Sequence, residues 1–254
     1  MAMPLSEPNN FPGGCSFDPN TLTCSPNLRT LLKNSRDSYV WPRGSTSAQS
    51  QQEVINTINF CQTRLYGLNA HTAREIVERV SCWADNNTKS HCNIVNSTHQ
   101  NMLKMKNAIE YLCNQKIKKG LLLLCEIPGV QMVIASKVYR FVAPESGTAI
   151  DRHSSYFFNS LPSPALPVLS SDFFREWSDG KHTSSRLAIY SPSRLSHNMD
   201  EFCTVYIPLC TSIAIDMNRS RNLYRCAATR MNKDWLPADV EMAAFYWWGA
   251  NGSR

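Results

Sequence analysis

The sequence lacks any hydrophobic run long enough to cross a bilayer. Its longest unbroken aliphatic stretch extends only from Leu121 to Leu124, whereas a membrane-spanning helix needs about 20 apolar residues. The segment from Met1 to Pro8 has neither a basic start nor an apolar core, so we expect no signal peptide and no contact with a membrane. We therefore expect a nuclear or cytoplasmic protein.

Glycine is also scarce, with 10 residues among 254. The sequence contains no glycine-rich phosphate loop, no dinucleotide fingerprint and no serine nucleophile elbow. These absences argue against phosphate-loop hydrolases, dinucleotide-dependent enzymes and α/β-hydrolases. With 43% hydrophobic and 18% charged residues, the composition is that of a globular protein. At this length we expect one large domain, or two lobes that share a cleft.

Cysteine is too dilute for a disulfide scaffold, since 10 cysteines are spread over 254 residues. We expect reduced thiols, many of them buried, with an extracellular disulfide-linked protein as the alternative. The spacing of Cys82, His91, Cys92 and His99 matches no closed zinc pattern. The sequence therefore predicts no metal site and no cofactor.

Local composition divides the chain. Residues 1–47 are rich in proline, asparagine, serine and glycine, which predicts an irregular N-terminal arm. Residues 48–254 are expected to form a helical domain. Within it, residues 163–200 show little periodicity and predict a long connection with short helical pieces. Residues 204–214 are compatible with either a buried helix or a strand.

Apolar residues recur every three or four positions after the arm, and this period predicts amphipathic helices. The first begins at Ala48, and the second follows Asn69 or Thr72 as its N-cap. A third is expected over Thr98 to Lys118. The final helix begins at Pro237, because proline fits the first helical turn and acidic residues follow it.

A break between two apolar segments predicts a helix-hairpin-helix at about residues 116–143. The first helix is expected to stop at Ile127, because Pro128 prevents its continuation and Gly129 permits a tight turn. A second helix follows within a few residues. Asp151 then stands at the start of the next element, where an isolated aspartate is typical of a helix N-cap.

This arrangement resembles the helix-hairpin-helix DNA glycosylase superfamily, and its 8-oxoguanine-glycosylase-like branch in particular. Members share an apolar-Pro-Gly-Val-Gly hairpin, a helix, and an apolar-Asp-x-His element. Ile127–Val130 match the hairpin and Ala149–His153 match the aspartate element, within a resemblance that is tightest over residues 116–161. The resemblance implies a mainly α, two-lobed helix-hairpin-helix DNA glycosylase-like fold. It also implies a duplex DNA partner and a monomer.

The resemblance assigns chemical roles to individual residues. Asp151 takes the place of the catalytic carboxylate, which stabilises positive charge on deoxyribose as the N-glycosidic bond breaks. Bifunctional members carry a lysine 18 or 19 residues before that aspartate, and Val133 and Met132 occupy those positions here. Neither side chain can form a Schiff base. Lys137 lies one turn beyond Val133 on the same helix face and is a substitute amine.

We therefore expect a monofunctional glycosylase of base excision repair, a hydrolase that releases a damaged or mismatched base. Flipping such a base out of the duplex costs less free energy than flipping a normally paired base. The alternative is a catalytically inactive DNA-binding or damage-sensing relative, because a fold does not guarantee an activity.

The resemblance also implies which residues contact DNA. Backbone N–H groups of Gly129, Val130 and Gln131 correspond to the phosphate-binding hairpin, although Gln131 replaces the second glycine of the family motif. A formal charge of +6 fits such contacts. Further contacts are expected from Lys118, Lys119, Arg152 and His153. A solvated helix face explains the lysines equally well, and a packing role explains the histidine. The aromatic run 245–248 is interpreted mainly as core, with stacking on a flipped base as the alternative.

Overall fold

The structure is a computed structural model, and it describes residues 12–41, 45–84, 88–159, 161, 177–178, 183–184 and 192–251. Within these ranges it does not describe the side chains of residues 88–90, 152, 156, 159, 177–178, 183–184, 192–194 and 197. The described chain is mainly helical, as the sequence predicts.

The N-terminal segment is not irregular throughout, which corrects the expectation for residues 1–47. Its described part contains a two-stranded antiparallel sheet and a helix: β1 (Phe17–Asp18), β2 (Thr23–Cys24) and α1 (Pro26–Asp37). Ser25 caps α1 by accepting a hydrogen bond from the Leu28 N–H, and Pro26 fits the first turn. The composition concealed this helix because serine and proline favour helix starts as well as loops.

The chain then forms a first group of helices: α2 (Ser47–Leu65), α3 (Ala70–Trp83), α4 (Thr88–Val95), α5 (His99–Cys113), α6 (Ile117–Cys125) and α7 (Met132–Val142). The expected amphipathic helices are α2, α3 and α5. Thr46 and Asn69 begin α2 and α3 through capping boxes. α5 ends at Cys113 instead of Lys118, because Gln115 adopts a positive φ of 58° before α6 begins.

A second group contains α1 and the elements that follow the hairpin: β3 (Trp177–Ser178), β4 (Thr183–Ser184), β5 (Tyr224–Arg225), β6 (Asn232–Lys233), α8 (Arg152–Asn159), α9 (Pro192–Glu201), a π-helical turn η2 (Phe202–Tyr206), α10 (Ile207–Arg219) and α11 (Pro237–Asn251). Residues 204–214 are therefore helical. Pro237 occupies the first turn of α11 as predicted, and the Asp239 carboxylate accepts a hydrogen bond from the Leu236 N–H. Most of residues 163–200 lies outside the described residues.

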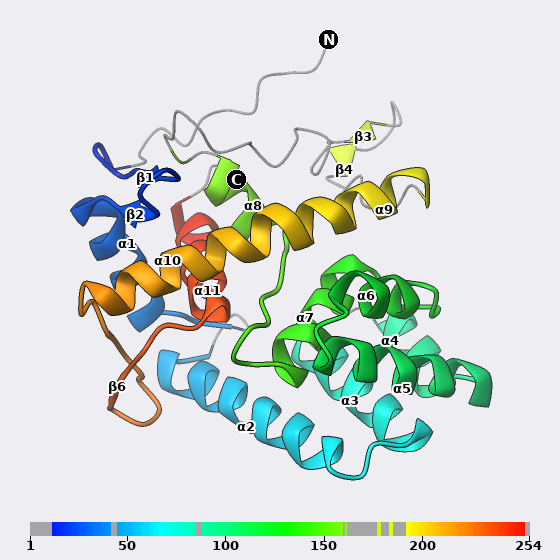
Figure 1. Cartoon of the computed structure of the whole chain (residues 1–254). Coiled ribbons are helices and arrows are strands. Elements are labelled where there is room, and N and C mark those ends of the chain that lie inside the picture. Colours follow the sequence, from blue (N-terminus) through cyan, green and yellow to red (C-terminus); the bar gives the residue numbers. More distant parts are fainter. Residues whose placement is uncertain are drawn as a thin grey trace.

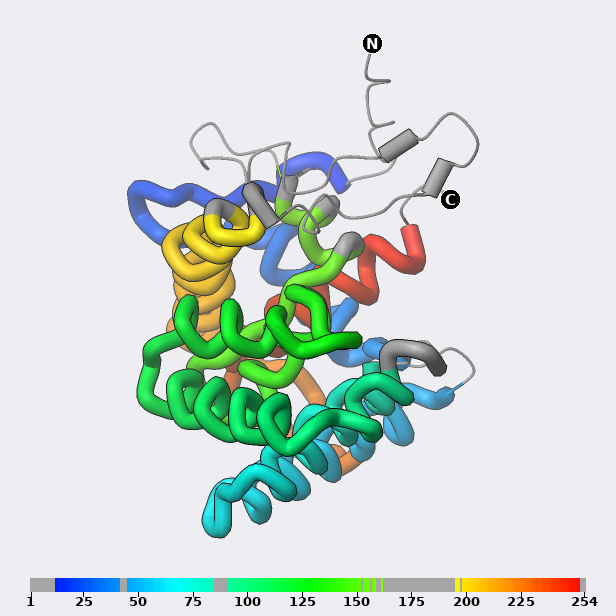
Figure 2. The backbone as a smooth tube through the Cα atoms, turned by 90° about the vertical axis from the view of Figure 1, so that its right-hand side faces the viewer, coloured from blue at the N-terminus to red at the C-terminus, as the bar shows by residue number. Residues whose placement is uncertain are grey.

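The two groups meet along α7 (Figure 1). α3 packs on α2 and α5, and α5 packs on α6, whereas α11 packs on α1, α8 and α10. Figure 2 shows the cyan and green helices of the first group gathered on one side and the α1, α10 and α11 segments on the other. α7 contacts α2, α3, α5 and α6, and its C-terminus leads through residues 143–151 into α8. One hydrophobic core continues through both groups.

Gly120 lets α6 approach α5 closely. A Cβ atom at this position would lie 2.7 Å from Leu112 Cγ and 2.9 Å from the Ala108 carbonyl oxygen. We expect Gly120→Ala to lower the free energy of unfolding by about 1–3 kcal/mol, because the two helices must move apart. Gly67→Ala is the matched control, since nothing lies within 4 Å of a Cβ built there. Urea unfolding compares the variants, and equal stability of Gly120→Ala and wild type would contradict this close approach.

All ten cysteines are free thiols, in agreement with the expectation of reduced cysteine. Five of them are buried: Cys15, Cys24, Cys61, Cys210 and Cys226. Among the described helices, none is both long and apolar enough to span a membrane.

Candidate active site

Charged side chains gather where α7, the start of α8 and α11 come together. Lys137 and Arg140 lie three residues apart on α7, so they project from one face of that helix. Asp151 directly precedes α8, and Glu241 lies near the start of α11. The four residues are 7%, 2%, 8% and 3% exposed, respectively. Burial of so many ionisable groups is costly, which makes this cluster the candidate functional site.

Lys137 lies between two indole rings. Its Nζ atom is 5.8 Å from the ring centroid of Trp41 and 5.6 Å from that of Trp83. Among the described residues it makes no hydrogen bond or ion pair. Burial lowers the pKa of the Lys137 amine, against the opposing effect of the Asp151 and Glu241 carboxylates. A lysine with a lowered pKa is more often neutral, and the neutral amine is the nucleophilic form.

Asp151 is the N-cap of α8, as an isolated aspartate at this boundary predicts. Its Oδ1 atom accepts a hydrogen bond of 2.9 Å from the Ser154 N–H, and the Asp151 N–H donates to Ser154 Oγ at 3.2 Å. These two bonds form a capping box that fixes the carboxylate. Oδ2 makes no hydrogen bond or ion pair with any described residue. Oδ1 is therefore fixed by the helix cap, whereas Oδ2 has no partner among the described residues and is available to contact a ligand.

Aromatic rings enclose the amine. The Trp41 indole N–H donates to the Trp83 carbonyl oxygen at 2.9 Å, which ties the segment after α1 to the end of α3. Phe245 of α11 packs edge-on against Trp41 at 5.3 Å and against His153 at 5.3 Å between ring centroids. The Trp83 indole Nε1 is buried without a hydrogen-bond partner among the described residues. These rings offer stacking faces and one uncommitted donor.

Arg140 and Glu241 form a buried ion pair beside the amine. Arg140 Nη1 donates to Glu241 Oε2 at 3.2 Å, and its guanidinium lies 4.9 Å from the ring centroid of Trp83. Burial raises the pKa of the Glu241 carboxyl to about 7, although the Arg140 charge opposes the shift. Asp151 reinforces it, because two nearby carboxylates disfavour a second negative charge. Glu241 is thus about half protonated near neutral pH.

Two helices joined by a turn lie where the sequence predicts the helix-hairpin-helix: α6, residues 126–131 and α7. α6 ends at Cys125, two residues before Ile127, where the sequence placed its end. Gly129 adopts a φ of +89°, the backbone conformation for which glycine is suited. Val130 is buried and its N–H donates to the Ile127 carbonyl oxygen at 2.9 Å, so that amide is already committed. Gln131 is exposed and precedes α7 without a side-chain cap, which leaves the first amides of α7 facing outward from the helix start.

The basic residues near the hairpin do not form one free face. Lys118 pairs with Asp200 at 2.6 Å, and Lys104 pairs with Glu126 at 2.7 Å. Lys119 is exposed, with its ammonium 4.2 Å from the ring centroid of Tyr111. Two other cations of this stretch, Lys137 and Arg140, are buried in the cluster. Acidic partners therefore reduce the positive charge that the sequence suggested for this surface.

The other residues predicted to contact DNA are Arg152, His153 and the aromatic run 245–248. The Arg152 side chain lies outside the described residues. His153 is half-buried against Phe245, which agrees with a packing role. Of the aromatic run 245–248, Trp247 is buried and packs on Phe157, whereas Phe245 reaches the candidate site. The interpretation of this run mainly as core is consistent with these contacts.

Metal ligands do not assemble in the part of the chain that the structure describes, where no group of three or more histidine, cysteine or acidic residues is placed to hold an ion. Cys82 Sγ lies 3.6 Å from His91 Nδ1, but no third ligand among the described side chains joins these two.

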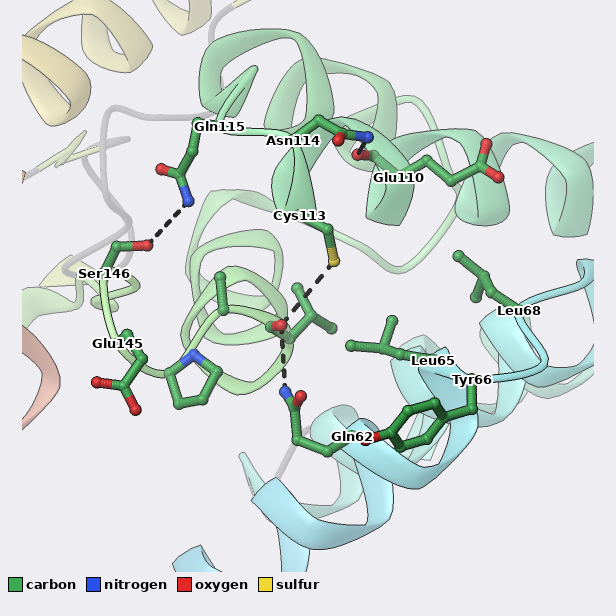
Figure 3. A pocket seen from close by; sticks show the side chains of 13 residues that line it. Gln62, Leu65, Tyr66, Leu68, Glu110, Cys113, Asn114, Gln115, Glu145 and Ser146 are labelled. Atoms are coloured by element: carbon green, nitrogen blue, oxygen red, sulfur yellow. Dashed lines mark hydrogen bonds between the residues drawn. The ribbon is translucent and has the colours of Figure 1, made fainter.

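A separate hollow of about 580 Å³ lies at the far end of α7 from the hairpin (Figure 3). It is bordered by the C-terminal ends of α2, α5 and α7, and the Gln62 side chain donates to the Val142 carbonyl oxygen there at 3.2 Å. Its charged lining residues are Glu110 and Glu145. Two carboxylates repel a phosphate backbone, so this hollow does not fit the expected DNA partner.

Sequence analysis identified Asp151 and Lys137 but missed the residues that surround them. Trp41 belongs to the segment that was expected to be irregular. The pattern around Trp83 indicates only an ordinary buried position of a helix. Glu241 was explained by the favourable interaction of a negative charge with a helix start. The signal that could have singled out Glu241 is its position between apolar residues of α11, where an unpaired carboxylate is costly.

Comparisons of the chain with protein-family models, with curated proteins and with solved structures find no match.

Proposed function

We propose that this protein removes a damaged or mismatched base from duplex DNA, with Asp151 and Lys137 at the reacting centre. The observation that carries the proposal is the position of the Lys137 amine, buried between Trp41 and Trp83 within the electrostatic reach of Asp151. The resemblance of the hairpin and the aspartate element to DNA glycosylases supplies the reaction class. The two-lobed glycosylase-like layout is part of the same proposal.

Asp151 acts on the sugar in this proposal. As the N-glycosidic bond breaks, positive charge develops on the deoxyribose ring, and the free Oδ2 atom stabilises it. Oδ1 stays bonded to the Ser154 N–H, so the carboxylate does not need to reorient. The indole rings take up the flipped base by stacking, which offsets part of the cost of unpairing it.

Lys137 distinguishes two courses of the reaction. In the hydrolytic course expected from the sequence, water attacks C1′ and the strand stays intact. In the amine course, neutral Lys137 Nζ attacks C1′ while the base leaves with the bonding electrons; the nitrogen then loses a proton to Asp151, O4′ takes up a proton as the ring opens, and an imine remains. The lowered pKa and burial of Lys137 favour the amine course.

The turn between α6 and α7 is the proposed DNA-binding element. The uncapped start of α7 and the exposed residue Gln131 lie where backbone N–H groups can meet a phosphate. The exposed Lys119 in the first turn of α6 adds a positive charge to the proposed contact. We therefore propose Gly129, Gln131 and Lys119 as backbone-positioning contacts that carry no sequence information.

The test is base release from labelled duplexes that carry 8-oxoguanine, uracil, an alkylated purine, hypoxanthine or a mismatch, analysed with and without alkali. Breaks that appear without alkali are expected for at least one duplex, because the imine acidifies the C2′ proton, and loss of that proton expels the 3′ phosphate and breaks the strand. Breaks that need alkali would instead show the hydrolytic course. Binding of duplex DNA without any base release would contradict the proposal and favour the inactive relative.

A further inference from the structure

A second pocket, of about 240 Å³, lies behind the candidate active site. It is bordered by α1, α2, α11, the end of α7 and the turn between β5 and β6. Its polar lining comes from Arg36, Cys226, Thr229, Lys233 and Asp239, and its apolar wall from Val54, Ile58 and Leu236. Arg140 also borders it, from the side that faces the candidate site. The pocket thus combines cationic groups with an aliphatic surface.

Arg36 is the central group of this pocket, and only one of its three guanidinium nitrogens has a hydrogen-bond partner among the described residues, so part of its hydrogen-bonding capacity stays available there. Its side chain is 3% exposed, and its Nε atom donates to Asp239 Oδ1 at 2.8 Å. Nη1 is buried and has no partner among the described residues. A guanidinium carries five N–H donors, and leaving them unpaired away from water is costly. The centroid of the Tyr224 ring lies 4.4 Å from the guanidinium carbon.

Positive charge exceeds negative charge around the pocket. Arg36, Arg140 and Lys233 face a single lining carboxylate, Asp239. Arg140 is paired with Glu241 at 3.2 Å, so the excess positive charge of the lining comes from Arg36 and Lys233 against Asp239. The pocket therefore favours a ligand with a negative charge.

Cys226 gives independent support for a preference for negative charge. Cys226 borders the pocket together with Thr229 and Arg36, and the neighbouring Thr229 side chain and the backbone N–H groups of Ala228 and Thr229 lower the pKa of its thiol. Burial raises the pKa of the Cys226 thiol, yet these neighbouring groups and the Arg36 charge lower it overall, whereas burial raises the pKa of the Cys15 thiol. The turn that follows β5 is held in place by the Ala227 N–H, which donates to Gln51 Oε1 at 2.8 Å.

We propose that this pocket binds a small organic anion, a carboxylate or phosphate with a short aliphatic group, whose charged end is held by Arg36 and Lys233 and whose carbon part lies against Val54 and Ile58. A duplex cannot supply this ligand, because the Arg36 side chain is almost completely enclosed. The proposal does not depend on the reaction proposed for Asp151 and Lys137.

The test uses Cys226 of the full chain as a reporter. Iodoacetate and iodoacetamide alkylate a thiolate alike: the sulfur attacks the methylene carbon, an S–C bond forms and iodide leaves. Only iodoacetate carries a negative charge. We expect the iodoacetate to iodoacetamide rate ratio, measured by mass spectrometry of each cysteine peptide, to be about tenfold higher at Cys226 than at the exposed Cys92. Equal ratios at the two cysteines would overturn the proposal.

Competition identifies the ligand class. Sodium isovalerate or inorganic phosphate is expected to slow alkylation of Cys226, whereas neutral isovaleramide is not. Protection by isovaleramide as strong as that by isovalerate would overturn the proposal, because the charge would then be irrelevant. Protection by duplex DNA alone would also overturn it, since the anion would then be a backbone phosphate.

Variants locate the charge. Arg36→Lys removes the guanidinium fork and is expected to abolish protection by the anions, but it also alters a buried ion pair. Lys233→Gln changes an exposed side chain and keeps the proposal falsifiable if Arg36→Lys does not fold. We expect Lys233→Gln to reduce the rate ratio at Cys226 about threefold, whereas Lys116→Gln, which changes an exposed lysine outside the pocket lining, leaves it unchanged. An unchanged ratio in Lys233→Gln would overturn the assigned role of Lys233.

Discussion

Asp151→Asn is expected to lower the rate of base release by about 10²–10³-fold while duplex binding stays within twofold of wild type. The expected loss is that of one preorganised electrostatic group acting on the charge of the transition state. Asparagine is as good an N-cap as aspartate, so the bond from the Ser154 N–H and the start of α8 are retained. The measurement is single-turnover base release, with the affinity for duplex DNA taken from fluorescence anisotropy.

Asp200→Asn is the matched control for this substitution. Asp200 is an exposed carboxylate that pairs with Lys118 at 2.6 Å, outside the buried cluster. Removal of its charge is expected to leave base release unchanged. Equal activities of Asp151→Asn and wild type would show that Asp151 acts only as a helix cap.

Glu241→Gln is expected to make the protein's stability less dependent on pH between about 4.5 and 7. The pKa of Glu241 is raised from 4.5 to about 7 in the folded protein, so folding favours the protonated carboxyl. This contribution is fully present below pH 4.5 and is lost as the pH rises through 7. A shift of this size corresponds to about 3 kcal/mol. Glutamine keeps the neutral shape and removes the titration.

Denaturant unfolding of wild type and Glu241→Gln at pH 5 and at pH 8 measures this effect. When the pH is raised from 5 to 8, the free energy of unfolding is expected to fall more in the wild type than in Glu241→Gln. Glu110→Gln is a suitable control, because Glu110 is a surface partner of Lys106 in α5. A stability difference between wild type and Glu241→Gln that is the same at both pH values would contradict a buried carboxyl that titrates near neutrality.

Sequence reasoning predicted the features that short segments determine by themselves. Asn69, one of the two N-caps left open by the sequence, the turn at Gly129 and the proline at the start of α11 act on their immediate neighbours. The N-cap position of Asp151 is local in the same sense. α1 was missed because it begins inside a segment whose composition is that of a loop.

The surroundings of the candidate site could not be predicted because they come from distant parts of the chain. Trp41, Trp83 and Glu241 meet Lys137 only after α3, α7 and α11 have packed together. Periodicity places Lys137 on the face of Val133, but it does not indicate whether that face is covered. The same limit applies to the lysines near the hairpin, where pairing with Asp200 and Glu126 depends on tertiary contacts.

Reductive trapping on a duplex that carries an abasic site tests directly whether Lys137 is the nucleophile. The free aldehyde of such a site forms an imine with a reactive amine, and borohydride reduces that imine to a stable covalent link. We predict a link at Lys137, lost in Lys137→Gln and retained in Lys116→Gln, where an exposed lysine with no proposed role is changed instead. Peptide mapping that places the link on another amine, or an absence of any link while base release continues, would contradict the assignment of Lys137 as the nucleophile.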